Sequence, residues 1–322
     1  MGKGSGFGKV ILFGEHFVVH SVPGIVSAID STVDAEVKKI GEGITVKDER
    51  KGARDYTQKK MSEQKQSIER MLRTMEIDPE KATLKIWLGG NLPGFSGIGA
   101  SAASSVAIAR AIAEEFRMDL SNEKINEIAY EAEKAYAGTP SGIDNTAATY
   151  GGLIWFKRNL SGGPNTIEKL SIREPVEIII CNTGIVADTK EMVAGVAARK
   201  KRNPGKYNLL FKQAKDLAFA TREALEKFDL RKVGKSMNEN HRLLQEIEVS
   251  CKELDYLVNL AREQGAFGAK LTGGGGGGCM VALTPGKELQ ETVAAAMEKE
   301  GFQVLRTKIG IQSIKEKMNL LE

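Results

Sequence analysis

Two carboxylates eleven residues apart are the first candidates for chemistry in this sequence. Glu133 falls in a stretch that favours a helix, and Asp144 follows a turn that contains glycine and proline, residues 138–142. Two carboxylates that converge on phosphate groups could bind Mg²⁺ and accept a proton from a hydroxyl. Taken singly, Glu133 is more often a solvated helix residue, and Asp144 a turn or capping residue. A chemical role for the two carboxylates is therefore supported only together with the motifs around them.

A glycine-rich segment, Pro93 to Ala103, is a candidate phosphate-binding loop. Its glycines at 94, 97 and 99 lie between a predicted strand (83–88) and a predicted helix (100–117). Glycine lets the backbone approach a ligand closely, and the N–H groups at the start of a helix attract phosphate. A tight turn without a ligand is an equally good interpretation of this segment alone. No Gly-Lys-Ser/Thr follows and position 102 is alanine, which argues against a Walker A loop and a dinucleotide fingerprint.

A second glycine cluster consists of six consecutive residues, Gly273 to Gly278, between apolar, strand-like stretches. The chain contains 35 glycines in 322 residues, which is about 11% against a usual value of about 7%. Each glycine in regular structure costs roughly 0.5–1 kcal/mol relative to alanine, so the bare backbone must serve a purpose here. Close approach to a substrate or nucleotide is one such purpose, and a flexible hinge is the alternative.

A lysine and a Glu-His pair near the first predicted strand form another candidate cluster. Lys9 begins the strand predicted over residues 9–13, and Gly14, Glu15 and His16 follow that strand directly. These signals are weak in isolation, because a lysine at a strand end and an exposed Glu-His pair usually face solvent. His16 by itself is more often a hydrogen-bonded structural residue than a catalyst.

Composition limits the classes of protein to which the chain can belong. It is 41% hydrophobic and 27% charged with a net charge of +4, which is typical of globular chains. The lack of an apolar stretch of about 20 residues argues against a membrane partner, and the N-terminus lacks the pattern of a signal peptide. The odd number of widely spaced cysteines fits a reducing cytosol, so we expect a cytoplasmic protein. The mild charge argues against nucleic-acid binding, and the basic run at 199–202 is more often a solvated helix end. Three scattered cysteines (Cys181, Cys251 and Cys279) and three histidines show neither disulfide nor zinc spacing.

Hydrophobic periodicity predicts an α+β fold of two domains that meet near residue 180, over residues 1–180 and 181–322. Residues 47–61 are highly charged without a clear period, and we interpret them as a loop or linker. The predicted strands are 9–13, 25–29, 33–37, 83–88, 176–181, 280–283 and 302–307. The predicted helices are 63–75, 100–117, 122–137, 188–199, 206–228, 230–247, 251–264 and 290–300, with a short one near 141.

Together the four segments resemble the three motifs of the GHMP kinases, a family of small-molecule kinases. The resemblance extends from Lys9 to about Thr307 and is greatest to the members that phosphorylate mevalonate. Residues 8–19 match the opening motif of those members, whereas galactose-phosphorylating members have an Asp-Tyr pair where this chain has Val18-Val19. The other matching stretches are residues 140–145, 182–184, 188–190, 238–244 and 270–279.

The resemblance implies a ribosomal protein S5 domain 2-like N-terminal domain and a ferredoxin-like C-terminal domain. It also implies transfer of phosphate from ATP to the C5 hydroxyl of mevalonate, in the mevalonate pathway of isoprenoid biosynthesis. Asp144 would be the catalytic aspartate with Lys9 beside it, and Ser101 and Glu133 would hold Mg²⁺. Relatives are often dimers, so the resemblance offers a homodimer as the assembly. The residues implied for the ATP phosphates are Pro93, Gly94, Ser96, Gly97, Ile98, Gly99, Ala100, Ser101 and Ala102, and those implied for mevalonate are Glu15, His16, Thr189, Gly274 and Gly275.

Two positions depart from the family pattern in the phosphate loop. Phe95 stands where the family has the first of three glycines, although Gly94 sits one position earlier, and Ala100 replaces the first of two serines. Phe95 leaves the loop path and the affinity for nucleotide open, and Ala100 removes one hydroxyl group near the phosphates. The alternative substrates are phosphomevalonate or a sugar, and the alternative class is an inactive relative that only binds. The presence of Lys9, Glu133 and Asp144 argues against that inactive class.

Overall fold

The computed structural model describes residues 1–40, 42–50, 58–95, 97–138 and 140–311, and its contacts divide the chain into two compact units. Unit 1 comprises the described residues within 1–9, 30–95 and 99–151, and unit 2 those within 10–29, 97–98 and 152–311. Strands β1 (Gly2–Phe13) and β2 (Gly24–Lys39) pair with each other, and each contributes residues to both units. The units are therefore discontinuous in sequence, and a single boundary near residue 180 stays a prediction.

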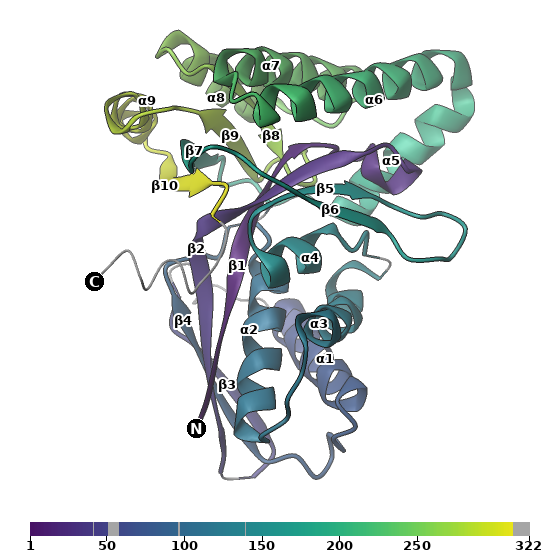
Figure 1. Cartoon of the computed structure of the whole chain (residues 1–322), viewed down its shortest axis with the longest axis vertical. Coiled ribbons are helices and arrows are strands. Elements are labelled where there is room, and N and C mark those ends of the chain that lie inside the picture. The colour runs from purple at the N-terminus through teal and green to yellow at the C-terminus, as the bar shows by residue number, and fades with distance from the viewer. Residues whose placement is uncertain (41, 51–57, 96, 139, 312–322) are drawn as a thin grey trace. The chain divides into compact units, whose positions relative to one another are not determined.

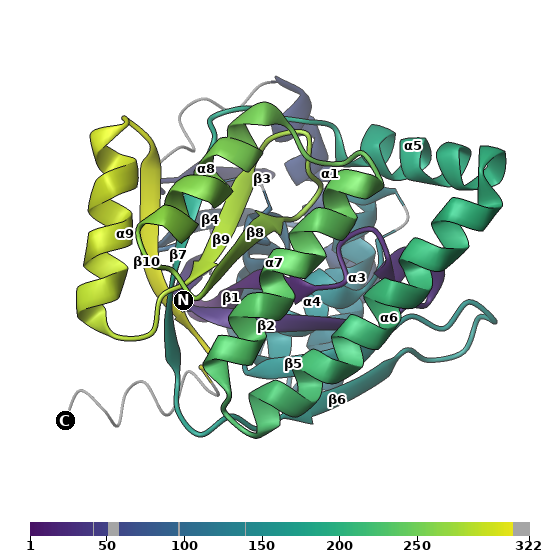
Figure 2. The ribbon, with the colours of Figure 1, turned by 90° about the horizontal axis from the view of Figure 1, so that it is seen from above.

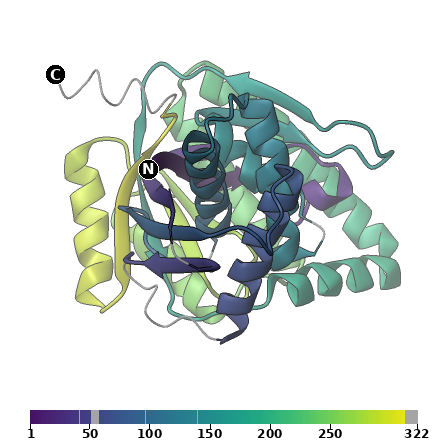
Figure 3. The same ribbon diagram turned by 90° about the horizontal axis from the view of Figure 1, so that it is seen from below.

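Unit 1 combines a small sheet with four helices, which Figures 1 and 3 show gathered on one side of its strands. Strand β3 (Ile44–Asp48) runs parallel to β4 (Leu84–Gly90), and β4 runs antiparallel to the C-terminal half of β2. Alternate residues of β4 are buried, as expected for a strand with one face toward a core. The helices are α1 (Gln58–Thr74), α2 (Ala100–Glu115), α3 (Asn122–Ala137) and α4 (Ile143–Tyr150).

Close packing of β1 on α2 sets the position of Lys9, a candidate site residue of unit 1. Helix α2 is rich in alanine, and it is faced by three glycines of β1: Gly2, Gly4 and Gly6. A Cβ atom on Gly4 would collide with the carbonyl oxygen of Ala107 and lie 2.7 Å from the nitrogen of Ala111. Only bare backbone fits at this distance. The same packing places Lys9, further along β1, next to the first turn of α2.

Unit 2 is built on an antiparallel sheet in the order β10–β7–β9–β8, covered by helices. The central strand β7 (Val176–Asn182) places Ile180 opposite Leu305 of β10 and opposite Val281 of β9. Helix α7 packs on β8, and α8 packs on β8 and β9, an arrangement visible in Figure 2. The remaining bounds are β8 Gly268–Thr272, β9 Cys279–Leu283, β10 Gln303–Ile309, α5 Thr189–Arg202, α6 Pro204–Glu226, α7 Leu230–Glu246, α8 Lys252–Glu263 and α9 Lys287–Lys299.

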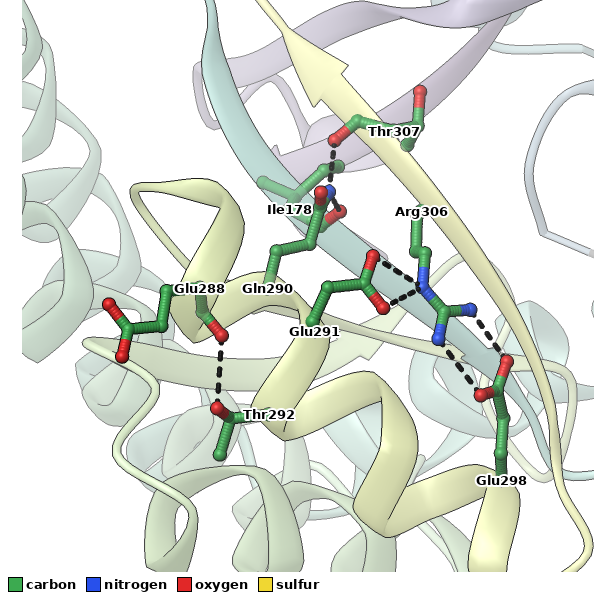
Figure 4. Close-up of polar contacts among 8 residues, drawn as sticks. All are labelled: Ile178, Glu288, Gln290, Glu291, Thr292, Glu298, Arg306 and Thr307. Atoms are coloured by element: carbon green, nitrogen blue, oxygen red, sulfur yellow. Dashed lines mark hydrogen bonds and ion pairs between the residues drawn. The ribbon is translucent and has the colours of Figure 1, made fainter.

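Polar side chains join α9 to β7 and β10 (Figure 4). The buried Gln290 donates from Nε2 to the carbonyl oxygens of Ile178, at 2.8 Å, and Thr307, at 2.9 Å. Arg306 of β10 donates to the carboxylates of Glu291 and Glu298 at 2.6–3.0 Å. Buried donors need acceptors, so Gln290 fixes the helix at one place over the sheet.

The predicted mixture of helices and strands is confirmed, and α3 has the predicted bounds. Two expectations about elements are wrong, and one hairpin was not predicted. Residues 25–29 and 33–37 belong to one strand, β2, which continues through the polar residues between them. The stretch 47–61 is not all loop, because β3 ends at Asp48 and α1 begins at Gln58, while residues 51–57 lie outside the described residues. Strands β5 (Leu153–Lys157) and β6 (Thr166–Leu170) form a hairpin that the sequence did not suggest, since β6 is largely exposed.

Candidate active site

The start of α2 in unit 1 has the geometry of an anion-binding helix end. Gly99 is its N-cap residue with φ +72°, and no side chain of the described residues caps the first turn. The absence of a capping side chain leaves the first N–H groups available to a ligand such as phosphate. A Cβ atom on Gly99 would lie 2.6 Å from Cγ of Lys9, so glycine also lets the loop pass over that lysine.

Most of the predicted phosphate loop is described by the structure. Pro93, Gly94 and Phe95 form irregular backbone before α2, and Ile98 is fully buried. Gly97 has φ +93°, a conformation in which glycine carries no steric penalty. Ala100, Ser101 and Ala102 are the first residues of the helix. The prediction for Ser96 falls outside the described residues.

Glu133 on α3 is a buried carboxylate that faces the start of α2. Its Oε2 accepts a hydrogen bond of 3.2 Å from the Ser101 hydroxyl, and its Oε1 has no hydrogen-bond partner among the described residues. Burial, with a smaller contribution from Asp144, raises the pKa of Glu133 to about 8. A buried carboxylate with an unused oxygen is suited to a cation, which would supply the missing positive charge.

Ser101 and Glu133 fit a Mg²⁺ site in which few of the ligands come from the protein. Within the described part of the chain, no group of three or more His, Cys, Asp or Glu side chains could hold a metal ion. Mg²⁺ is usually bound by one or two protein ligands together with phosphate oxygens and water. One hydroxyl and one carboxylate next to a phosphate-binding helix end match that pattern.

Lys9 and Asp144 form an ion pair within unit 1. The Nζ atom of Lys9 lies 3.0 Å from Oδ1 of Asp144. The lysine side chain is 3% exposed and the aspartate side chain is 37% exposed, so the cation is buried and the carboxylate is accessible. Asp144 lies in the first turn of α4, where the helix dipole favours negative charge. An accessible carboxylate held by a buried cation can orient or accept the proton of a hydroxyl.

The predicted substrate residues of unit 2 meet around the glycine cluster. Nε2 of His16 lies 2.9 Å from the carbonyl oxygen of Gly274, and a Cβ atom on Gly274 would lie 2.5 Å from Oγ1 of Thr189. Gly275 has φ +72° and lies against the carbonyl of Val249, where a side chain would collide. The glycine cluster thus permits close packing against Thr189 at the start of α5, and the hinge interpretation is not needed to explain it.

His16 is buried, and its surroundings favour the neutral ring. Burial lowers its pKa to about 4, and the hydrogen bond to Gly274 opposes this shift only partly. A carbonyl oxygen only accepts hydrogen bonds, so Nε2 carries the proton and Nδ1 keeps its lone pair. Nδ1 is buried and has no hydrogen-bond partner among the described residues.

Glu15 is also fully buried, and it interacts with two residues to which the sequence analysis assigned no role. Lys270 of β8 forms an ion pair with its carboxylate, and Asn240 of α7 donates to the same carboxylate at 3.4 Å. A lysine inside an apolar strand was the signal in the sequence that could have identified Lys270. Nothing in the pattern around Asn240 sets it apart from other helix residues.

Comparison with known proteins identifies the group to which this chain is related. Residues 64–152 match the model of the GHMP kinases N terminal domain, and residues 221–303 match that of the GHMP kinases C terminal. Mevalonate kinase of Pyrococcus furiosus is 34% identical over 335 aligned residues, which cover 95% of this chain and 96% of the relative. The chain belongs to the GHMP kinase family.

Solved structures of GHMP kinases have the same fold. The crystal structure of L. major mevalonate kinase in complex with R-mevalonate is 37% identical to this chain, with a TM-score of 0.90 and coverage of 97% and 96% of the two chains. Phosphomevalonate kinase of Streptococcus pneumoniae is 15% identical with a TM-score of 0.73, over 95% of this chain and 98% of that one, and shows the fold alone. Among the described helices, none combines the length and the apolar character needed to cross a membrane.

Proposed function

We propose that this GHMP kinase transfers phosphate from ATP to the C5 hydroxyl of mevalonate, giving 5-phosphomevalonate and ADP in the mevalonate pathway. The observation that carries the choice of substrate is similarity over nearly the whole chain to mevalonate kinases, at 34% and 37% identity. The likeness to phosphomevalonate kinase, at 15% identity, extends only to the fold. No specific observation favours a sugar or an inactive relative.

The Lys9–Asp144 pair has the arrangement that the chemical step needs. In phosphoryl transfer most of the catalysis comes from positioning and charge stabilisation. The accessible carboxylate of Asp144 would orient or accept the proton of the C5 hydroxyl. Lys9, 3.0 Å from that carboxylate, would stabilise the negative charge that develops on the attacking oxygen.

The start of α2 would hold the phosphates of ATP. Its uncapped N–H groups, together with the backbone of residues 93–102, form the proposed phosphate contacts. Ser101 and Glu133 would hold Mg²⁺, which when bound supplies positive charge to the phosphate oxygens. Phe95 and Ala100 change the family pattern beside these contacts, and we propose that the backbone rather than a second serine hydroxyl carries the binding.

Glu15, His16, Thr189, Gly274 and Gly275 form the proposed mevalonate-binding group of unit 2. The contacts of His16 and Thr189 with Gly274 support this assignment, because three predicted residues that are far apart in sequence lie together. We also propose a cytoplasmic enzyme, in keeping with three cysteines that form no disulfide bond among the described residues. A homodimer is the proposed assembly, and neither nucleic acid nor membrane is needed for the reaction.

A substrate panel tests the proposed function directly. Purified protein with Mg·ATP is given mevalonate, phosphomevalonate, galactose or homoserine, and release of ADP is followed. We expect turnover with mevalonate and a much lower kcat/KM with the other three compounds. Preference for any other member of the panel would overturn the choice of substrate, and no turnover with all four would favour the inactive relative.

A further inference from the structure

A buried ion pair joins strand β8 to the segment that follows β1. The side chains of Lys270 and Glu15 are both 0% exposed, and the ammonium group donates to Oε1 of the carboxylate. Lys270 also donates to the carbonyl oxygens of Leu271, at 2.6 Å, and Ile11, at 3.3 Å. Asn240 donates to the other carboxylate oxygen at 3.4 Å. Both oxygens of Glu15 are therefore held by groups that lie more than 200 positions away in the sequence.

Glu15 belongs to a tight turn that carries His16. The N–H of Phe17 donates to the carbonyl oxygen of Glu15 at 2.6 Å, which encloses His16 in a three-residue turn, and the N–H of Val18 donates to Gly14 at 2.8 Å. His16 has φ +61°, a conformation that residues with a side chain rarely adopt. Such a conformation persists only where the surrounding contacts fix it. The Glu15 side chain, held by Lys270, is one of those contacts.

The turn determines where the free lone pair of His16 points. Nε2 donates its proton to the carbonyl oxygen of Gly274, so Nδ1 is the nitrogen that can accept a hydrogen bond. A lone pair on nitrogen can bind a hydroxyl group but repels a carboxylate. A small rotation of the turn would move Nδ1 away from any ligand that it binds.

We propose that Lys270 is a positioning residue for substrate binding: through Glu15 it fixes the turn that presents Nδ1 of His16 to a hydroxyl group of the substrate. This inference rests on the proposed function, because the hydroxyl is taken to be that of mevalonate. Lys270 touches no substrate in this scheme, since its ammonium group is fully enclosed by protein atoms.

The first test needs no substrate. The chain has three histidines, so labelling with ¹⁵N-histidine gives few ring signals, which single substitutions at His16, His20 and His241 assign. We expect Lys270→Met to shift the ring nitrogen signals of His16 and to change its tautomer ratio. His241 should also respond, because its Nδ1 accepts from the N–H of Leu271 next to Lys270. The decisive signal is therefore that of His16.

Gln290→Leu is the matched control for this experiment. Like Lys270, Gln290 is a buried donor to two backbone carbonyl groups of unit 2, but it contacts Ile178 and Thr307 rather than the turn (Figure 4). We expect both variants to lower Tm, and we expect Gln290→Leu to leave the His16 signals unchanged. A general loosening of unit 2 would instead move His16 in both variants, and that result would overturn the inference.

The second test is kinetic. We expect Lys270→Met to raise KM for mevalonate roughly tenfold to a hundredfold, with little change in KM for ATP, as loss of positioning requires. Gln290→Leu should leave both constants unchanged. If the wild type phosphorylates mevalonate while Lys270→Met changes neither the His16 signals nor KM, the inference fails. If the His16 signals change in Lys270→Met but the wild type does not phosphorylate mevalonate, the proposed function fails, and the effect of Lys270 on the position of His16 stands.

Glu15→Gln serves if Lys270→Met does not fold. It keeps the shape of the side chain and removes the charge that holds the ammonium group. We expect the same shift of the His16 signals, and these signals are the readout for this variant, because Glu15 itself belongs to the proposed mevalonate-binding group and a rise in KM would not separate the two roles. Unchanged His16 signals in a folded Glu15→Gln variant would overturn the role of the ion pair.

Discussion

Glu133 and Asp144 are two carboxylates of unit 1 whose surroundings give them different properties. Glu133 is buried, one of its oxygens has no hydrogen-bond partner in the described part of the chain, and burial raises its pKa to about 8. Asp144 is 37% exposed, sits at the start of a helix and pairs with a buried lysine. Such a division is typical of sites in which one carboxylate needs a cation and the other handles a proton. The local sequence patterns do not distinguish the two carboxylates, because each residue is ordinary where it stands, and the roles proposed for them came from the resemblance to the family.

Substitution Asp144→Asn tests the role of the accessible carboxylate. The amide keeps the shape but cannot accept the proton of a hydroxyl, so we expect kcat with mevalonate to fall by a factor on the order of 10²–10⁴. KM for ATP should change little. The control is Asp216→Asn, the same chemical change on an exposed position of α6, for which full activity is expected. Near-full activity of Asp144→Asn would remove Asp144 from the chemical step.

At the scale of elements, helices with clear ends were predicted best. Helix α3 has its predicted bounds because Ser121 accepts a hydrogen bond from the N–H of Lys124 at its start, while Gly138 ends it with a positive φ. The hairpin β5–β6 was missed because its polar outer strand has no alternating pattern. The turn at His16 could not be predicted, since the lysine that holds it is 255 positions away in the sequence.

The packing of β1 on α2 gives a prediction about stability. Gly4→Ala would place a methyl group against the backbone of Ala107 and Ala111, so we expect loss of about 1–3 kcal/mol in the free energy of unfolding. The control is Gly89→Ala on β4, where no described atom lies within 4 Å of the new Cβ. That variant should be neutral or slightly stabilised. Urea unfolding of both proteins measures the difference, and equal effects would contradict the proposed close packing.

For the whole molecule, buried histidines link folding to pH. Burial lowers the pKa values of His16 and His241 to about 4, whereas an unfolded chain has histidine pKa values near 6.5. Between these values the unfolded state binds more protons than the folded state. The contribution of each histidine to stability is therefore fully present above pH 6.5 and is lost as the pH falls toward 4.

His241 offers the clearest test of this linkage, because both its nitrogens are already in use. Nδ1 accepts from the N–H of Leu271 at 3.3 Å, and Nε2 lies 3.1 Å from Oδ1 of Asp255. A second proton would have to bind Nδ1, where it would face the N–H of Leu271. We expect His241→Gln to be less stable than the wild type at pH 7.5. The difference in unfolding free energy should shrink by roughly 2–3 kcal/mol at pH 4.5, because only the wild type loses the histidine contribution. Denaturant titrations of both proteins at the two pH values measure the change, and subtraction removes the shared groups that do not interact with His241. A difference that stays constant with pH would show that His241 titrates alike in the folded and unfolded states.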